Sequence, residues 1–378
     1  MRRLVGAAAL LWWAEAEGAR VWRGVATMRA HLSMKAQPRL PTTEDLTDPR
    51  LWLEEVEGEE SLGWVREVNA NTLKAIGDPS STDEYRRMLD ILDSDEKIPY
   101  IGRVLNGLYY NFWQDENNVR GIWRRCTPEQ YREEQPAWEV VLDLDALGKQ
   151  EDVSWVWAVL DEGPGVRKDR VILSLSPGGS DATVAREFDL DKKEFVPASA
   201  GGFELPEAKS QFSYKDRDTL LVGGVFGEEE MTDSGYPRTV REWKRGTPLA
   251  DAIKVYEGEQ TDVAASGYAY LDRGEKYEIR SRAITFYTSS YLLKRGEGSF
   301  LPVAVPEDAQ LSTFSDQLLI TLRSSWLGFE AGSLLAAPSG EFLGSADDEA
   351  RKALLTPLFE PTETSSLEGA SETKSESA

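Results

Sequence analysis

The sequence is nearly devoid of histidine and cysteine. Among 378 residues there is one histidine, His31, and one cysteine, Cys126. A single cysteine excludes an intrachain disulfide and a cysteine-based metal cluster, and it suits a reducing compartment such as the cytoplasm. A serine triad needs an imidazole to accept the serine proton near neutral pH. Because His31 precedes the first predicted folded element, we expect no triad in this chain and assign no catalytic residue.

Positive charge and long apolar runs are also scarce. Lys and Arg number 43 against 66 Asp and Glu, which gives a net charge of −23. An acidic surface of this kind repels phosphate backbones, so we expect no nucleic-acid partner. No apolar run reaches the length that a bilayer requires, so no membrane span is expected.

The first forty residues have a composition of their own. Residues 1–40 hold seven Arg or Lys and two Glu, and Arg2 and Arg3 precede an apolar run from Leu4 to Ala14. This pattern is typical of a secretory or organellar leader, although Met28 and Met34 are alternative starts. We predict that residues 1–40 are a leader or a disordered extension. If residues 1–33 act as a leader, the expected location is an organelle or the cell exterior instead of the cytoplasm.

Residues 41–97 are predicted to be helical. After Gly58, apolar residues recur at helix-compatible spacing, at Leu62, Val65, Val68 and Leu73. A second helix is expected over about residues 82–92, where Ser81 and Glu84 have the spacing of a capping box. We interpret the apolar stripe of this second helix as ordinary packing; it consists of Tyr85, Met88, Leu89 and Leu92.

From Ile98 onward, short alternating apolar runs are separated by turn clusters, which is typical of an all-β fold. Strand–turn–strand units recur, each with earlier strands before it, at Trp138–Leu147, Arg186–Val196, Arg241–Glu257, Tyr291–Val305 and Ser333–Phe359. Four strands in roughly 40–50 residues make a propeller blade, and a tandem of β-sandwiches is the alternative. We predict a mainly β fold with a partial, about five-bladed propeller over residues 98–361. The polar residues 362–378 are predicted to be a disordered tail.

Several strings, taken in order, resemble the N-terminal region of the prolyl oligopeptidase family. They are Asp48–Val56, Ser174–Ala182, Gly201–Ser210, Thr232–Arg238, Trp243–Leu249 and Leu358–Thr362. The resemblance covers roughly residues 41–369. It implies a seven-bladed propeller that sits over an α/β-hydrolase domain, with the preceding helices packed on the hydrolase. It also implies that the propeller admits short peptides and excludes folded proteins, and that the hydrolase cleaves after proline or, in some relatives, after basic residues.

The nucleophile elbow of that family, Gly-x-Ser-x-Gly, does not occur in this sequence. Its nearest approach, Gly178–Ala182, ends in alanine, and we interpret it as a hairpin turn. Gly163-Pro164-Gly165 has Lys168 where a dinucleotide fingerprint needs its third glycine, and Gly223–Gly227 lacks the Lys-Ser/Thr of a phosphate loop. We therefore expect no nucleotide cofactor.

No metal site is expected either. The cluster of Asp93, Asp95 and Glu96 lacks the glycine and the final glutamate of a calcium loop. The second acidic cluster is interpreted as a turn; it consists of Asp189, Asp191 and Glu194. Cys126 follows Arg124 and Arg125, which could lower the pKa of its thiol, and a small residue ending a strand is the alternative.

Together these features predict the substrate-gating propeller of a prolyl-oligopeptidase-like serine peptidase. Its hydrolysis of short peptides would belong to an α/β-hydrolase domain outside this sequence. A non-catalytic propeller that binds peptides or proteins is the alternative, and a product that does not fold stably is a third possibility. Five blades of a seven-bladed ring would leave sheet faces exposed, which is a liability for aggregation or an opportunity for a partner. Cleavage-site preference would be decided mostly in the hydrolase domain.

Overall fold

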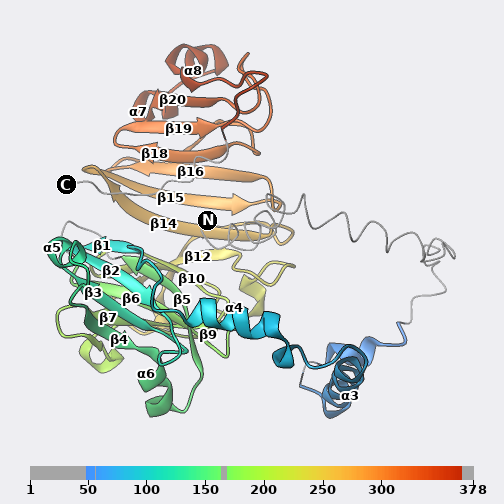
Figure 1. Ribbon diagram of the computed structural model, residues 1–378. Coiled ribbons are helices and arrows are strands. Elements are labelled where there is room, and N and C mark those ends of the chain that lie inside the picture. Colours follow the sequence, from blue (N-terminus) through green and yellow to red (C-terminus); the bar gives the residue numbers. More distant parts are fainter. Residues whose placement is uncertain (1–47, 56, 163–167, 368–378) are drawn as a thin grey trace. The chain divides into compact units, whose positions relative to one another are not determined.

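The computed structural model describes residues 48–55, 57–162 and 168–367 (Figure 1). The chain divides into two compact units, Met1–Arg87 and Met88–Ala378. The extension predicted over residues 1–40 lies outside the described residues. So does the part of the predicted tail that follows residue 367.

Two α-helices dominate the N-terminal region. Helix α3 (Glu59–Ile76) is followed by Gly77, whose φ of 85° is a conformation that favours glycine. Helix α4 (Asp83–Asp93) begins at the end of the first unit and continues into the second. Short 3-10 turns, η2 (Leu51–Glu54) and η3 (Pro79–Ser81), precede α3 and α4 respectively. Among the described residues, no helix combines the length and apolar content that a membrane span requires.

The predicted capping box at Ser81 is wrong by one residue. The Thr82 hydroxyl accepts a hydrogen bond from the Tyr85 backbone N–H at 3.1 Å and so caps α4. The Ser81 hydroxyl instead donates to the Asp78 carbonyl at 2.7 Å, within the preceding turn. Thr82 has extended backbone angles, so it is the residue whose side chain faces the first turn of the helix.

The second unit contains five antiparallel sheets in succession, which confirms the prediction of a mainly β, propeller-type fold (Figure 1). Along each sheet the first four strands follow one another in sequence order. Sheet I comprises β1 (Arg103–Leu105), β2 (Leu108–Trp113), β3 (Ile122–Cys126) and β4 (Glu139–Asp143). Sheet II comprises β5 (Trp155–Glu162), β6 (Arg170–Pro177), β7 (Thr183–Asp189) and β8 (Glu194–Phe195), and β9 (Glu204–Ala208) also pairs with β7.

The remaining three sheets have four strands each. Sheet III comprises β10 (Gln211–Asp216), β11 (Thr219–Gly223), β12 (Thr239–Lys244) and β13 (Ile253–Glu257). Sheet IV comprises β14 (Ala264–Asp272), β15 (Glu275–Ala283), β16 (Ser289–Arg295) and β17 (Leu301–Pro302). Sheet V comprises β18 (Gln310–Phe314), β19 (Gln317–Thr321), β20 (Leu334–Pro338) and β21 (Thr356–Phe359).

Short helices connect some of these strands, namely α5 (Pro128–Tyr131), α6 (Leu144–Glu151), α7 (Ser339–Leu343), α8 (Asp348–Leu354), η4 (Ala198–Ala200), η5 (Glu228–Glu230) and η6 (Leu249–Asp251). The strand–turn–strand unit predicted over Trp138–Leu147 is wrong in its second half. Only the first half forms a strand, β4, and helix α6 follows it. The Asp143 carboxylate accepts from the Ala146 backbone N–H at 2.8 Å and starts a helix where a turn and strand were expected.

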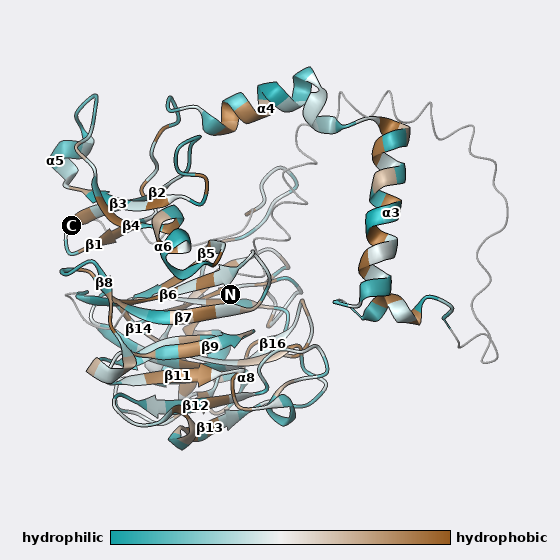
Figure 2. Cartoon of the chain, turned by 90° about the horizontal axis from the view of Figure 1, so that it is seen from below, coloured by the Kyte–Doolittle hydropathy of each residue, from teal (hydrophilic) through white to brown (hydrophobic). Residues whose placement is uncertain are grey.

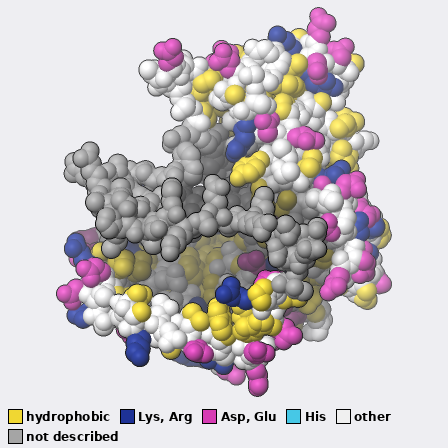
Figure 3. Space-filling model, turned by 90° about the vertical axis from the view of Figure 1, so that its right-hand side faces the viewer, with side chains coloured by type: hydrophobic (Ala, Val, Ile, Leu, Met, Phe, Trp, Pro, Cys, Tyr) yellow, Lys and Arg dark blue, Asp and Glu magenta, His cyan; other side chains and the backbone are white. Residues whose placement is uncertain are grey.

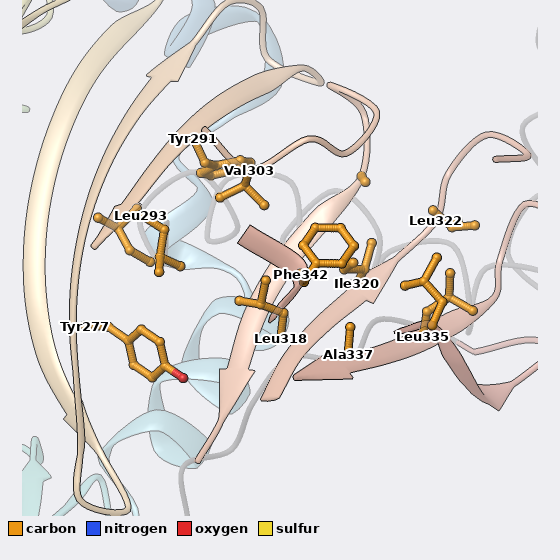
Figure 4. Close-up of a cluster of buried hydrophobic side chains, with 13 residues drawn as sticks. Tyr277, Tyr291, Leu293, Val303, Leu318, Ile320, Leu322, Leu335, Ala337 and Phe342 are labelled. Atoms are coloured by element: carbon orange, nitrogen blue, oxygen red, sulfur yellow. The ribbon is translucent and has the colours of Figure 1, made fainter. Parts of the chain in front are cut away.

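Apolar side chains fill the contacts between successive sheets, which we call seams. In Figure 4, Tyr277 and Leu293 of sheet IV point toward Leu318 and Ile320 of sheet V, and Phe342 from α7 completes the cluster. Comparable clusters occupy the seams between sheets I and II and between sheets II and III. Each fully buried side chain of this size stabilises the fold by roughly 1.5–3 kcal/mol. The core is therefore distributed over the seams.

Candidate functional site

The serine string that most resembles a nucleophile elbow lies in a hairpin. Gly178–Ala182 joins β6 to β7, and Gly178 and Gly179 have φ angles of 68° and 92°. The Ser180 hydroxyl donates to the Ala182 carbonyl at 3.3 Å, so its proton is engaged within the turn. His31 lies outside the described residues.

The other candidate motifs are loops and turns. Gly163-Pro164-Gly165 lies outside the described residues, and Gly223–Gly227 runs from the end of β11 into a loop that leads to η5. Asp189 accepts hydrogen bonds from the backbone N–H groups of Asp191 (3.1 Å) and Lys192 (2.9 Å), which forms the turn between β7 and β8. In the described ranges, no three His, Cys, Asp or Glu side chains are close enough to hold a metal ion. The described ranges include the first acidic cluster, which lies at the end of α4 and consists of Asp93, Asp95 and Glu96.

Cys126 ends strand β3 and is buried. Burial raises the pKa of its thiol, and the charge of Arg124 offsets this only in part. The predicted lowering of this pKa is therefore wrong, and the alternative of a small strand-ending residue describes the site. Arg125 has little influence because it points to the opposite face of sheet I, as alternation along a strand requires.

The two N-terminal helices carry exposed apolar side chains. In Figure 2, hydrophobic and hydrophilic residues alternate along α3 and α4. The α4 stripe, which the sequence led us to interpret as ordinary packing, is exposed: Met88 retains 59% and Leu92 67% of its accessible surface. On α3 the exposed residues include Trp64, Val65, Val68 and Leu73. An amphipathic helix buries its apolar stripe against a partner, so these stripes are candidate docking surfaces.

A buried carboxylate joins sheets II and III. Glu187 on β7 is 0% exposed and accepts hydrogen bonds from the Tyr214 hydroxyl (2.6 Å) and from both terminal amino groups of Arg245 (2.7 and 2.8 Å). The hydrogen bonds to Glu187 raise the pKa of Arg245, and burial together with the neighbouring carboxylate raises the pKa of Tyr214. The Arg245 guanidinium also lies 4.4 Å from the ring centroid of Phe203. This cluster, the Glu187 clamp, was not found by sequence reasoning, since its members are far apart along the chain.

A second carboxylate lies at the same seam. Asp161 on β5 accepts from the Tyr214 backbone N–H at 3.2 Å. Its residue retains some accessible surface, but its carboxyl group is enclosed, and burial raises its pKa to about 7. Asp161 therefore titrates near neutral pH. Nothing in the surrounding sequence distinguishes it from other strand-ending acids.

The seam between sheets III and IV holds buried charges. Glu278 on β15 is 2% exposed, and Arg280 contacts it at 3.1 Å. Lys215 and Glu242 of sheet III complete the network, with Lys215 at 2.5 Å from Glu242 and 3.9 Å from Glu278. Paired charges of this kind fix the register between sheets, because either one alone would be costly to bury.

Sheets II, III and IV have neighbouring sheets on both faces, whereas sheets I and V each have one in the described part of the chain. The free face of sheet V has a hollow of about 470 Å³ lined only by uncharged residues, namely Phe314, Gln317, Leu319, Ala336, Thr356 and Leu358. The face of the molecule in Figure 3 shows acidic, basic and hydrophobic side chains interspersed. Charge alone therefore does not mark a binding site on that face.

Comparison with known proteins identifies relatives over most of the chain. The family model for the prolyl oligopeptidase N-terminal β-propeller domain matches residues 34–320. An uncharacterized peptidase of Sinorhizobium fredii is 31% identical over 367 residues, which cover 91% of this chain and 49% of the relative. An uncharacterized peptidase of Rickettsia prowazekii is 31% identical over 336 residues, covering 82% and 45%. The chain thus spans about half the length of the curated relatives it matches.

Solved structures give the same assignment. A post-proline cleaving enzyme from Rickettsia typhi is 30% identical with a TM-score of 0.73, and the match covers 82% of this chain and 47% of that one. Oligopeptidase B from Leishmania major shares the fold at 13% identity and a TM-score of 0.56, covering 79% and 41%. The chain belongs to the prolyl oligopeptidase family and matches its N-terminal β-propeller domain.

Proposed function

We propose that this chain is the substrate-gating propeller of a prolyl-oligopeptidase-like serine peptidase, in which an α/β-hydrolase domain outside the sequence hydrolyses short peptides. The match to the family's propeller domain over residues 34–320 carries this proposal. The similarity to a post-proline cleaving enzyme at 30% identity supports proline-containing peptides as the substrate class. Residues 41–97 would form the helical segment and residues 98–361 the incomplete propeller.

The exposed stripes of α3 and α4 support a docking role for the helical segment. Met88 and Leu92 are more than half exposed, and the contact of such apolar side chains with water is unfavourable. The partner that the family resemblance implies for them is a hydrolase domain. The chain then contributes shape and position to the reaction. The serine, its base and its oxyanion donors would belong to the hydrolase domain.

The Glu187 clamp and the charged seam between sheets III and IV support a gating role for the sheets. A gate that excludes folded proteins has to resist deformation, and buried charge pairs are costly to pull apart. The single cysteine supports a reducing compartment, and we place the protein in the cytoplasm on that basis.

The proposal is tested with a proline-linked chromogenic peptide. The full chain alone should not hydrolyse it. A chimera in which this chain replaces the matched part of the Rickettsia typhi enzyme should hydrolyse it, and a serine-directed inhibitor should abolish that activity. Inhibitor-sensitive turnover by the chain alone, or an inactive but folded chimera, would overturn the proposal.

The free faces of sheets I and V favour a second candidate, a non-catalytic propeller that binds a peptide or protein. Translation of the genomic sequence that follows the codon for Ala378 separates the two ideas. A reading frame with a Gly-x-Ser-x-Gly elbow supports the peptidase, and a stop codon with transcript support favours the binding module.

A further inference from the structure

The free face of sheet I has an arginine enclosed by tryptophans. Arg124 on β3 lies between two indole rings, with its guanidinium carbon 4.3 Å from the ring centroid of Trp113 and 4.5 Å from that of Trp138. Arginine stacks on aromatic faces in this way when a site holds a planar cation in one orientation. The side chain is half-buried although it lies on a sheet face that no other sheet covers.

A hydrogen bond to the neighbouring strand β2 fixes the orientation of this guanidinium. Its Nε donates to the Asn111 side-chain oxygen at 2.8 Å, and the Asn111 amide in turn donates to the Tyr100 carbonyl at 3.0 Å. Asn111 is 1% exposed and pairs with Arg124 across β2 and β3. With Nε engaged, the two terminal amino groups are the Arg124 donors that no described residue satisfies, and they form the flat fork that binds carboxylates.

Arg124 has no carboxylate partner among the described residues. Asp115, the acid whose charge affects Arg124 most, already accepts hydrogen bonds from the Trp113 indole and from Asn117 and Asn118. Burial lowers the pKa of Arg124 to about 10, which reflects lost hydration that no carboxylate replaces. The terminal amino groups of Arg124 make no hydrogen bond to any described residue.

Elsewhere in this molecule, cations at sheet faces meet carboxylates of the next sheet. Seams I–II, II–III and III–IV each contain such a pair, respectively Arg103–Glu162 at 2.9 Å, Arg245–Glu187 at 2.7 Å and Lys215–Glu278 at 3.9 Å. Beside Arg124, Val104 and Val140 remain exposed and offer an apolar surface for a sheet to pack against. The free face of sheet I thus has both parts of a seam, an apolar surface and a cation, but the opposing carboxylate is missing from the described residues.

We propose that the free face of sheet I binds a β-sheet that presents an aspartate or glutamate to Arg124, whose two terminal amino groups receive the carboxylate. A second copy of this chain fits less well, because a symmetric pairing of these faces brings two Arg124 cations into one interface. The hollow on sheet V cannot serve either, because its lining carries no charge. The inference rests on the proposed function in taking the occupant to be a sheet like those of the propeller. The test measures only peptide binding, so this inference and the proposed function can fail independently of each other.

The test uses the full chain and two cyclised β-hairpin peptides with an Asn-Gly turn. One hairpin carries a glutamate between two valines on one face, and its twin carries glutamine at that position. Wild-type chain should bind the glutamate hairpin about tenfold or more tightly than the glutamine hairpin, because a charged, two-pronged hydrogen bond is lost in the twin. Arg124→Gln should remove this preference. Arg124→Lys, which keeps the charge without the fork, should reduce it, and this variant decides the matter if Arg124→Gln fails to fold.

Lys276→Gln is the matched control, since it removes the same charge from an exposed position on sheet IV and should keep the full preference. Equal affinity for the two hairpins, or no binding of either at millimolar peptide, overturns the proposal. Light scattering tests whether a second copy of the chain occupies this face. A wild-type dimer that dissociates in the Arg124→Gln variant would assign the face to a second copy and would also overturn the proposal.

Discussion

Both terminal amino groups of Arg245, just after β12 in sheet III, bind the carboxylate of Glu187 in sheet II, at 2.7 and 2.8 Å. The glutamate is fully buried, whereas the arginine keeps part of its side chain in solvent. The two residues are 58 positions apart in the sequence, so this pair forms only when the sheets meet. It connects sheets II and III in addition to the apolar contacts of their seam.

Substitution of Arg245 by methionine should destabilise the second unit by about 3–5 kcal/mol, because Glu187 would remain buried without its counter-charge. The free energy of unfolding in urea measures this loss. Glu187→Gln combined with Arg245→Met should recover part of it. As a control, Arg217→Met removes an arginine whose side chain is 64% exposed, and it should cost less than about 1 kcal/mol. Equal losses for the two arginines would contradict a special role of the clamp.

Asp161 should make stability depend on pH. Its pKa is raised from 3.8 to about 7 in the folded chain, so the folded state holds this proton more tightly than the unfolded state does. The stabilisation is complete below the unfolded pKa, and it is lost as pH rises through the folded value. Asp161→Asn keeps an acceptor for the Tyr214 N–H, so its stability relative to wild type should rise as the pH increases from about 4 to about 7 and then level off. Thermal melts across this range measure the difference, and a constant difference would show that Asp161 does not titrate there.

Gly267 on β14 should tolerate no side chain. A Cβ atom at this position would lie 2.8 Å from a methyl group of Val240 in sheet III. Gly267→Ala should destabilise the chain by about 1–3 kcal/mol through overpacking. Val240→Ala in the same chain should relieve part of this loss. If the double variant is destabilised by the sum of the two single effects, the two sites do not interact.

The exposed stripe of α4 should be dispensable for folding but required for docking. Leu92→Ser should change the unfolding free energy of the isolated chain by less than about 0.5 kcal/mol. Leu173→Ala, a matched loss of an apolar side chain in the buried seam between sheets I and II, should cost about 2–5 kcal/mol. In the chimera with the Rickettsia typhi enzyme, Leu92→Ser should lower peptide turnover. Unchanged turnover would contradict docking through α4.

The sequence was informative where structure follows local pattern. Alternating apolar residues predicted the succession of sheets, and the prediction failed at Asp143, where a helix cap and a turn look alike until the following residues pack. The residues of the candidate sites follow no local pattern. The burial of Glu187 depends on Arg245 in another sheet, and alternation along β3 places Arg124 on one face of sheet I but cannot reveal that no carboxylate meets it. Both facts depend on pairing between distant segments.

The most direct measurement compares cleavage of two substrates by the chimera: a short proline-containing peptide, and the same cleavage sequence placed in a loop of a folded protein. A gating propeller predicts rapid cleavage of the peptide and little cleavage of the folded protein, and loss of this selectivity when residues 98–361 are deleted. Cleavage of both substrates at similar rates by the intact chimera would contradict the gating role.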